Sequence, residues 1–361
     1  MGVTINKFVL LLIASSFLWT SPAAGGTSKK SEDENPPIFY PPAPNLPRLQ
    51  YLTKYSSAYD VSAANSKFRD FVFGGEDKEE QVVNKPYGVA IHDGAIYVVD
   101  TRGAGYVVFD VANGKWRSVT GRGDGAMKKP ISITIDEDGT RYITDTQREV
   151  VIVFDSKDRF LRTLGSPGQF RPADVAISGN RLYITDVKHQ KVHVLDKSTG
   201  ETLFVFGEAG TEEGQMAHPT HLAIGPDGTV YLTDTTNFRV QQFSPDGEFI
   251  RQFGSVGTGF GQFARPKGID VDRDGRIYVV DAAFQNVQIF DGAGKALMFF
   301  GGVSDERDSF SLPAAVKIDY DNVEYFRQYA DPDFEIEYLV LVVNQLGLNK
   351  VAVFGFGSLK D

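Results

Sequence analysis

The chain has 361 residues, a formal net charge of -10 and no cysteine. The absence of cysteine excludes disulfides, thiolate zinc sites, iron–sulfur clusters and a cysteine nucleophile. The acidic balance argues against nucleic acid as a partner, and 42% hydrophobic residues are enough for a large folded core.

Residues 1–24 have the pattern of a secretory signal. Lys7 supplies a positive charge, Phe8–Trp19 is an apolar stretch too short for a membrane span, and Ser21–Ala24 offers small residues for cleavage. No later apolar run is long enough to span a bilayer. We therefore expect a secreted or periplasmic protein with no transmembrane segment after cleavage. An uncleaved N-terminal anchor is the alternative.

A polar and proline-rich stretch follows at residues 25–47. It ends in PPIFYPPAPNLP, whose prolines favour an extended polyproline conformation and cannot donate to a sheet ladder. This composition predicts a semi-rigid linker in front of one domain at residues 48–361.

Six similar units fill the rest of the chain, each opened by a proline. The clearest is His218–Phe253, in which four short apolar alternations are separated by Asp-Gly turns, the pattern of a four-stranded antiparallel meander. Successive opening prolines are 44, 42, 47, 47 and 47 residues apart. They are Pro86, Pro130, Pro172, Pro219, Pro266 and Pro313.

The second run of each unit ends in a small polar acceptor. We expect these side chains to accept backbone N–H groups at a tight turn, because a feature repeated in every unit favours a structural role over a ring of metal ligands. The residues are Asp100, Asp145, Asp186, Asp234, Asp281 and Asn344.

Six such meanders predict an all-β fold, a six-bladed β-propeller of four-stranded antiparallel blades, because a closed ring buries both apolar faces of every sheet. The last unit ends soon after its third strand, so an N-terminal strand must close it. Arg48–Tyr55 and Phe68–Gly74 are the candidates, and the second fits the phase of the other fourth strands better.

These units resemble the NHL repeat. The resemblance rests on the opening proline, the YVVD-type strand end, the RVQ-type third strand and the segment Gly254–Pro266, and it covers residues 68–357. It implies a six-bladed β-propeller. It implies no single activity, because NHL propellers include protein-binding, RNA-binding and enzymatic members.

The two residues after each opening proline should stand at the mouth of the central channel, and they differ from blade to blade. We predict a ligand site there, in which Asp174 orients His221 as a base and Lys267 attracts a small polar or anionic group. A solvated, inert rim is the alternative. The predicted ligand-binding residues are Tyr87, Ser132, Asp174, His221 and Lys267.

An acidic and aromatic insertion, Asp319–Glu337, separates the first two strands of the last unit. It should project from the face opposite the mouth. Aromatic and arginine side chains are typical of protein contacts, so we predict partner contacts there, with a loop packed on its own aromatic residues as the alternative. The predicted contact residues are Tyr325, Phe326, Arg327 and Tyr329.

The leading hypothesis is therefore a non-catalytic binding scaffold for a protein, peptide or glycan, without a cofactor. The alternative is a lyase or lactonase-like hydrolase with a divalent metal in the central channel. Peptide-amidating lyases are similar propellers with a three-histidine zinc centre. The five histidines of this chain do not match that constellation, and we expect His189 and His193 to face outward.

Overall fold

The computed structural model describes residues 36–62, 82–304 and 306–360 of the chain. The predicted signal at residues 1–24 and the strand candidate Phe68–Gly74 lie outside the described residues. Residues 37–361 form one compact unit. In the part of the chain that the structure describes, no helix has the length and apolar character needed to cross a membrane.

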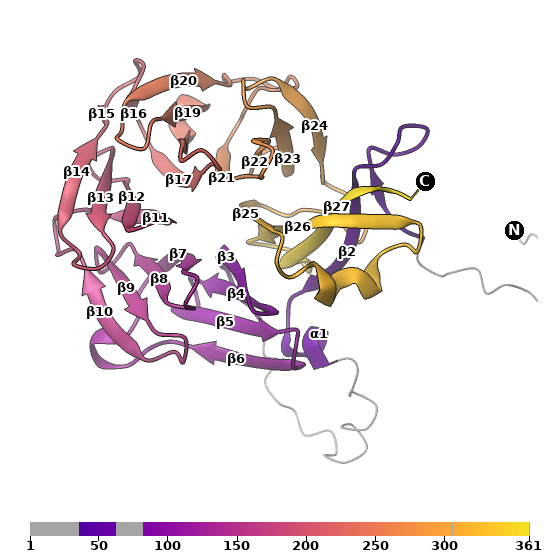
Figure 1. Cartoon of the computed structure of the whole chain (residues 1–361), viewed down its shortest axis with the longest axis horizontal. Helices are drawn as coiled ribbons and strands as arrows, with labels where there is room; N and C mark the ends of the chain where they lie inside the picture. Colours follow the sequence, from indigo (N-terminus) through magenta and orange to yellow (C-terminus); the bar gives the residue numbers. More distant parts are fainter. Residues whose placement is uncertain (1–35, 63–81, 305, 361) are drawn as a thin grey trace, which may run out of the picture. The chain divides into compact units, whose positions relative to one another are not determined.

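Six antiparallel sheets surround a central channel as the blades of a propeller (Figure 1). The first five blades have four strands each, paired in chain order from the centre outward. Their strands are β3 (Pro86–His92), β4 (Ala95–Asp100), β5 (Gly105–Asp110) and β6 (Lys115–Val119); β7 (Pro130–Ile135), β8 (Arg141–Asp145), β9 (Val150–Phe154) and β10 (Phe160–Leu164); β11 (Pro172–Ser178), β12 (Arg181–Asp186), β13 (Lys191–Asp196) and β14 (Thr202–Phe206); β17 (Pro219–Ile224), β18 (Val230–Asp234), β19 (Arg239–Phe243) and β20 (Phe249–Phe253); and β21 (Pro266–Val271), β22 (Ile277–Asp281), β23 (Asn286–Phe290) and β24 (Ala296–Phe300).

The sixth blade joins the two ends of the domain. Its strands are, from the centre outward, β25 (Pro313–Asp319), β26 (Phe334–Asn344), β27 (Val351–Leu359), β2 (Leu49–Tyr55) and β1 (Phe39–Tyr40). The innermost strand β25 contacts β21 of the fifth blade and β3 of the first, so the ring is closed. The predicted fold and its closure by an N-terminal strand are confirmed.

The closing strand is β2, the candidate that fits the phase of the other fourth strands less well. It pairs antiparallel with β27, from Leu49 opposite Phe356 to Tyr55 opposite Val351. Strands β26 and β27 are longer than the strands of the other blades. Strand β2 can therefore pair along β27 without the short ending, an aromatic residue followed by glycine, that other fourth strands have. The structure also differs from the predicted linker, because Phe39 and Tyr40 pair with β2 as a fifth strand at the edge, where flanking prolines are tolerated.

The hydrophobic core lies between blades rather than in one central mass. One cluster joins Tyr97 and Val108 of the first blade to Ile143 and Phe154 of the second, and equivalent clusters fill the other interfaces. Tyr55 of β2 belongs to the cluster between the sixth and first blades. Burial of both faces of every sheet is what makes the repeat stable only as a ring.

Short elements complete the described fold. They are α1 (Ala58–Ser62), the two-residue strands β15 (Glu208–Ala209) and β16 (Gln215–Met216), and the 3₁₀ turns η2 (Gly123–Gly125), η3 (Thr235–Asn237) and η4 (Val323–Tyr329). The turn η4 lies in the predicted insertion between β25 and β26.

A register shift follows the opening proline in every blade. In β7, for example, Pro130 pairs with Asp145, but pairing resumes only at Ile133. Proline has no N–H to donate, and a bulge next to it frees the following residues from the ladder. The two residues after each proline therefore sit where the inner strand enters the channel, which positions the candidate site.

Candidate functional site

The aspartate or asparagine that ends each second strand binds backbone N–H groups at the channel mouth. Asp145 accepts backbone N–H groups of Lys128 (2.6 Å), Lys129 (3.1 Å), Gln147 (3.1 Å) and Arg148 (3.0 Å). Equivalent bonds to backbone N–H groups are made by Asp100, Asp186, Asp234 and Asp281, and by Asn344 in the sixth blade. These side chains have the predicted structural role.

Asp186 has a further role that the sequence did not reveal. His189 Nδ1 lies 2.7 Å and His193 Nε2 3.2 Å from its Oδ2 atom. Burial alone would raise the pKa of Asp186, but the hydrogen bonds from His193 and its other partners hold that pKa below its usual range. His193 is buried against Phe170, so the expectation that it faces outward is wrong.

In the first five blades the strand-end aspartate accepts the N–H of the residue just before the opening proline. Of the six residues that precede the opening prolines, four are lysine or arginine. Their side chains are exposed. The carbonyl of each also accepts a backbone N–H from the following loop, so all stand at one level of the ring. The six residues are Lys85, Lys129, Arg171, His218, Arg265 and Leu312. We call Lys85, Lys129, Arg171 and Arg265 the cationic rim.

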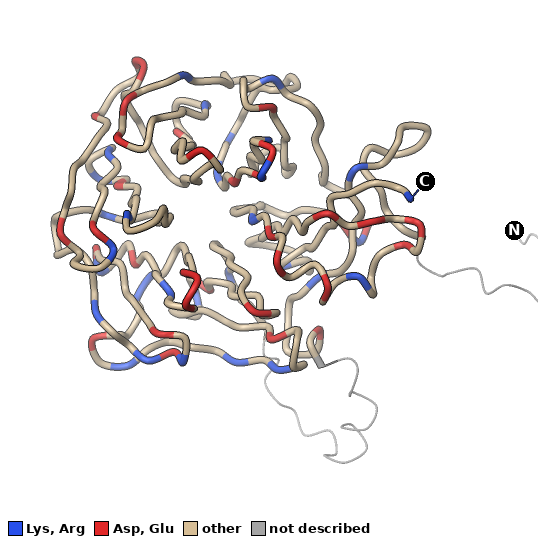
Figure 2. The backbone as a smooth tube through the Cα atoms, in the orientation of Figure 1, with Lys and Arg blue, Asp and Glu red and all other residues tan. Residues whose placement is uncertain are grey.

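The cationic rim contrasts with the charge of the whole chain. Figure 2 shows lysine and arginine interspersed with aspartate and glutamate around the ring, without segregation to one side. Among the described residues, no carboxylate lies within 4.0 Å of the charged groups of Lys85, Lys129 or Arg265, and Arg171 lies 3.5 Å from Glu149. The rim was not predicted from the sequence, although the repeats, aligned on their prolines, place its four residues at one equivalent position.

A pocket of about 470 Å³ opens at this mouth. It is bounded by Tyr87 on one side and by Lys129, Arg171 and His218, with Thr146 and Gln147 adding polar groups. Glu149 also borders it, paired with Lys188 at 3.2 Å.

The predicted mouth residues Tyr87 and Lys267 meet across the channel. Lys267 Nζ donates to the Tyr87 hydroxyl at 2.9 Å and lies 4.7 Å from the centre of its ring. The ring of His221 stacks on Tyr87, with centroids 5.8 Å apart and an interplanar angle of 5°. Residues from the first, fourth and fifth blades thus converge at one point, as their positions after the prolines predicted.

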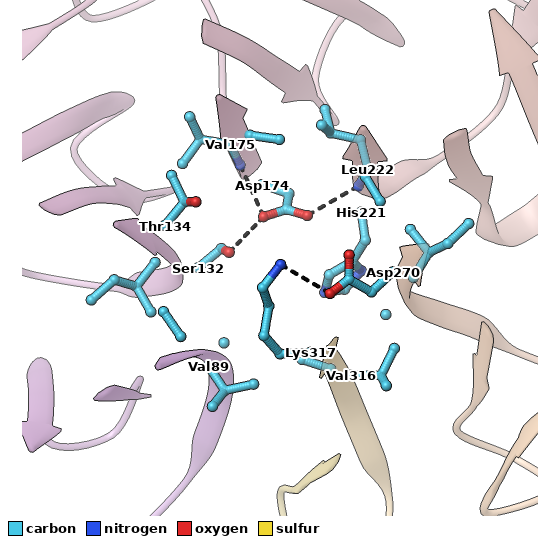
Figure 3. A pocket seen from close by; sticks show the side chains of 18 of the residues that line it. Val89, Ser132, Thr134, Asp174, Val175, His221, Leu222, Asp270, Val316 and Lys317 are labelled. Atoms are coloured by element: carbon cyan, nitrogen blue, oxygen red, sulfur yellow. Dashed lines mark hydrogen bonds and ion pairs between the residues drawn. The ribbon is translucent and has the colours of Figure 1, made fainter. Parts of the chain in front are cut away.

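Below this point the inner strands enclose a cavity of about 180 Å³ (Figure 3). The predicted residues Ser132, Asp174 and His221 line it. Asp270 and Lys317 also line it, with Lys317 Nζ 2.9 Å from Asp270 Oδ2. These two were missed because only two positions after each proline were considered; they stand at the fourth, which faces the same way in a strand.

Asp174 does not orient His221, which corrects the predicted acid–base pair. Its carboxylate accepts hydrogen bonds from Ser132 Oγ (2.5 Å), the Val175 N–H (2.9 Å) and the Leu222 N–H (3.0 Å). Both ring nitrogens of His221 are buried, and among the described residues neither has a hydrogen-bond partner. The carboxylate of Asp174 therefore binds the backbone of its own strand and that of the inner strand of the next blade.

Burial dominates the electrostatics of the cavity. It raises the pKa of Asp174 to about 6, against the lowering effect of the Ser132 hydrogen bond. It lowers the pKa of His221 to about 3, and the charge of Lys267 adds to that effect. His221 is therefore a neutral imidazole at physiological pH. Over residues 36–62, 82–304 and 306–360, no cluster of three histidine, aspartate or glutamate side chains is arranged to hold a metal ion.

The insertion in the sixth blade packs back onto the domain. Asn322 Oδ1 accepts the Gly94 N–H at 2.6 Å, at the turn between the first two strands of the first blade. Phe326 is fully buried, so its predicted role in partner contact is wrong, because it fills the core beside Tyr55. Tyr325 and Tyr329 are 39% and 38% exposed, and the exposed Arg327 pairs with Glu324.

Comparison with known proteins agrees with this architecture. A family model described as a 6-bladed beta-propeller matches residues 221–298. The chain is a six-bladed β-propeller. The NHL resemblance is compatible with this match.

A curated relative is peptidyl-glycine alpha-amidating monooxygenase A of Xenopus laevis, 32% identical over 117 residues. That match covers 30% of this chain and 12% of the relative, so the propeller chain spans only a small part of the relative's length.

Two solved structures share the fold. A gluconolactonase from Xanthomonas campestris is 14% identical with a TM-score of 0.56, over 89% of this chain and 98% of that one. A virginiamycin B lyase from Staphylococcus aureus is 13% identical with a TM-score of 0.52, over 76% and 95% of the respective chains. At these identities the likeness concerns the fold alone.

Proposed function

We propose that this propeller is a secreted or periplasmic, non-catalytic binding scaffold that holds an acidic peptide segment of a partner protein at the proline-led mouth. The observation that carries the proposal is the cationic rim, in which Lys85, Lys129, Arg171 and Arg265 occupy equivalent positions in four of six blades of a chain with net charge -10. Exposed cations at the mouth of an acidic protein attract and orient anions.

Three of the four rim cations act on Tyr87, which borders the mouth pocket. Burial raises the pKa of Tyr87, and the charges of Arg265, Lys85 and Lys129 oppose that rise. Three of the rim cations lack a carboxylate partner among the described residues, so a carboxylate-bearing ligand would not have to displace an existing ion pair. Exposed pairs contribute only about 0.2–1 kcal/mol each, so several must act together and binding should weaken with salt.

The mouth pocket favours a peptide as the carrier of those carboxylates. Thr146, Gln147 and His218 offer hydrogen-bonding groups beside Lys129 and Arg171, as a peptide backbone with acidic side chains requires. The ring of Tyr87, the aromatic side chain that lines the pocket, is already in contact with His221 and Lys267 and is less available for stacking on a sugar.

Calorimetric titration with an oligoglutamate peptide tests the proposal. We expect binding that weakens about tenfold or more in the double variant Lys129→Glu, Arg171→Glu and remains in the control variant Lys115→Glu, Lys295→Glu, which changes the same total charge away from the mouth. An oligoglutamine peptide that binds equally well would refute an anionic ligand. An oligogalacturonate of equal charge that binds more tightly would identify a glycan instead.

An enzyme is the second candidate, because the buried and unpartnered His221 borders the 180 Å³ cavity. This candidate is worth testing because a lactonase and a lyase have similar folds. Stoichiometric zinc or calcium in the purified protein, lost in the variants Asp174→Ala and His221→Ala, would favour a metal-dependent hydrolase or lyase over the scaffold.

A further inference from the structure

Lys267 is an unusual lysine for a residue at a channel mouth. It is only 6% exposed, and among the described residues no aspartate or glutamate oxygen lies within 4.0 Å of its Nζ atom. A buried ammonium is normally compensated by an opposite charge. Here its hydrogen-bonding partner is the hydroxyl of Tyr87.

The charges that act on Lys267 itself are cationic, whereas the carboxylate of Asp174 acts on its partner Tyr87. Burial lowers its pKa to about 8, and the charges of Arg265 and Lys85 add to that effect. Burial keeps the pKa of His221 near 3, so its imidazole is neutral at neutral pH, and burial also lowers the pKa of His218. Burial raises the pKa of Tyr87, which keeps its hydroxyl protonated. The result is an amine that is partly neutral beside a phenol that holds a proton.

We infer that Lys267 is a nucleophilic amine that captures an anionic aldehyde or 2-oxo acid as a reversible imine, an inference that rests on the proposed attraction of anions to the mouth. A desolvated lysine near other cations is the general form of an imine-forming residue. The amine lies one hydrogen bond behind Tyr87, which borders the mouth pocket, and the cationic rim would hold the carboxylate of such a ligand.

The step balances with the groups present. The lone pair of the neutral amine attacks the carbonyl carbon and a C–N bond forms. The carbonyl oxygen takes a proton from the Tyr87 hydroxyl, and Tyr87 regains one from the nitrogen it already contacts. A second proton transfer along the same path releases the oxygen as water and leaves the C=N bond, so no oxidant or reductant is required.

Reductive trapping tests this inference on the full chain. Glyoxylate and sodium cyanoborohydride at pH 7.5 should convert Lys267 to a carboxymethyl derivative, located by peptide mass spectrometry. With a pKa of about 8, about a quarter of the Lys267 amine is neutral at that pH, against about one part in a thousand for an ordinary lysine. We therefore expect Lys267 to react at least about tenfold faster than the exposed Lys295.

Matched variants separate this inference from the proposed function. Tyr87→Phe keeps the ring but removes the proton donor, and should slow trapping at Lys267 about tenfold without changing trapping at Lys295. Glyoxylate that modifies Lys267 no faster than Lys295 would overturn the inference, whatever the peptide titration shows. Rapid trapping of the neutral aldehyde propanal, equal to that of glyoxylate, would support the amine and contradict the attraction of anions.

Discussion

Asp174 of the third blade and Leu222 of the fourth are joined by a hydrogen bond, with the Leu222 N–H donating to Oδ2 of Asp174 at 3.0 Å. Asp270 and Ile318 repeat the arrangement between the fifth and sixth blades at 2.8 Å. Buried carboxylates thus connect neighbouring inner strands around the cavity. Because burial shifts the pKa of such a carboxylate, the free energy of unfolding should depend on pH.

We predict that Asp174→Asn flattens one part of the pH dependence of unfolding. The folded pKa of Asp174, about 6, lies above its ordinary value of 3.8, so its contribution to stability is fully present below pH 3.8 and is lost as the pH rises through 6. At about 1.4 kcal/mol per pKa unit the loss is about 3 kcal/mol. Denaturant unfolding of both proteins between pH 4 and 7 measures it, and parallel curves would contradict the prediction.

His221 should have the opposite effect. Its folded pKa of about 3 lies below the ordinary 6.5, so its contribution to stability is present above pH 6.5 and is lost as the pH falls toward 3. His221→Leu should remove an acid-induced loss of about 5 kcal/mol. At pH 7 the variant should be at least as stable as the parent, because neither ring nitrogen has a hydrogen-bond partner in the part of the chain that the structure describes. Equal acid sensitivity of the two proteins would show that His221 is not buried as described.

Two matched aromatic substitutions test which N-terminal segment closes the ring. Tyr55 is 1% exposed and packs against Phe109 and Phe326, so Tyr55→Ala should lower the free energy of unfolding by about 3–5 kcal/mol. Phe71→Ala, in the other candidate strand, should cost much less, because β2 already occupies the place beside β27. A larger loss for Phe71→Ala would show that closure depends on the segment Phe68–Gly74.

Strand-end acids should tolerate an amide better than truncation. The sixth blade already has Asn344 at this position, where its Oδ1 accepts the Ser311 N–H at 3.1 Å. Asp145→Asn should therefore retain acceptor bonds and cost about 1–2 kcal/mol, whereas Asp145→Ala removes the acceptor of several part-buried N–H groups at once and should cost about 3 kcal/mol or more. Thermal unfolding compares the two, and equal losses would mean that the charge, not the acceptor geometry, matters.

The fold could be predicted from the sequence because each unit repeats the same spacing of proline, strand end and turn. The closing strand was harder to predict, since Leu49–Tyr55 belongs to no repeat and pairs with a blade whose strands are longer than the rest. The site was predicted only in outline. Position after the proline placed Tyr87, His221 and Lys267 together, but the partner of Asp174 is a backbone N–H in another blade, which spacing alone does not reveal.

Zero-length carbodiimide crosslinking of a labelled oligoglutamate peptide tests binding at the proline-led mouth most directly, because it joins a bound carboxylate to the lysine amine that it contacts. We expect amide crosslinks at Lys85 and Lys129, suppressed by salt. We expect few at Lys115, Lys157 and Lys295, which are also exposed but lie on outer strands and turns. Crosslinks spread over all five lysines, or concentrated on the last three, would contradict binding at the mouth.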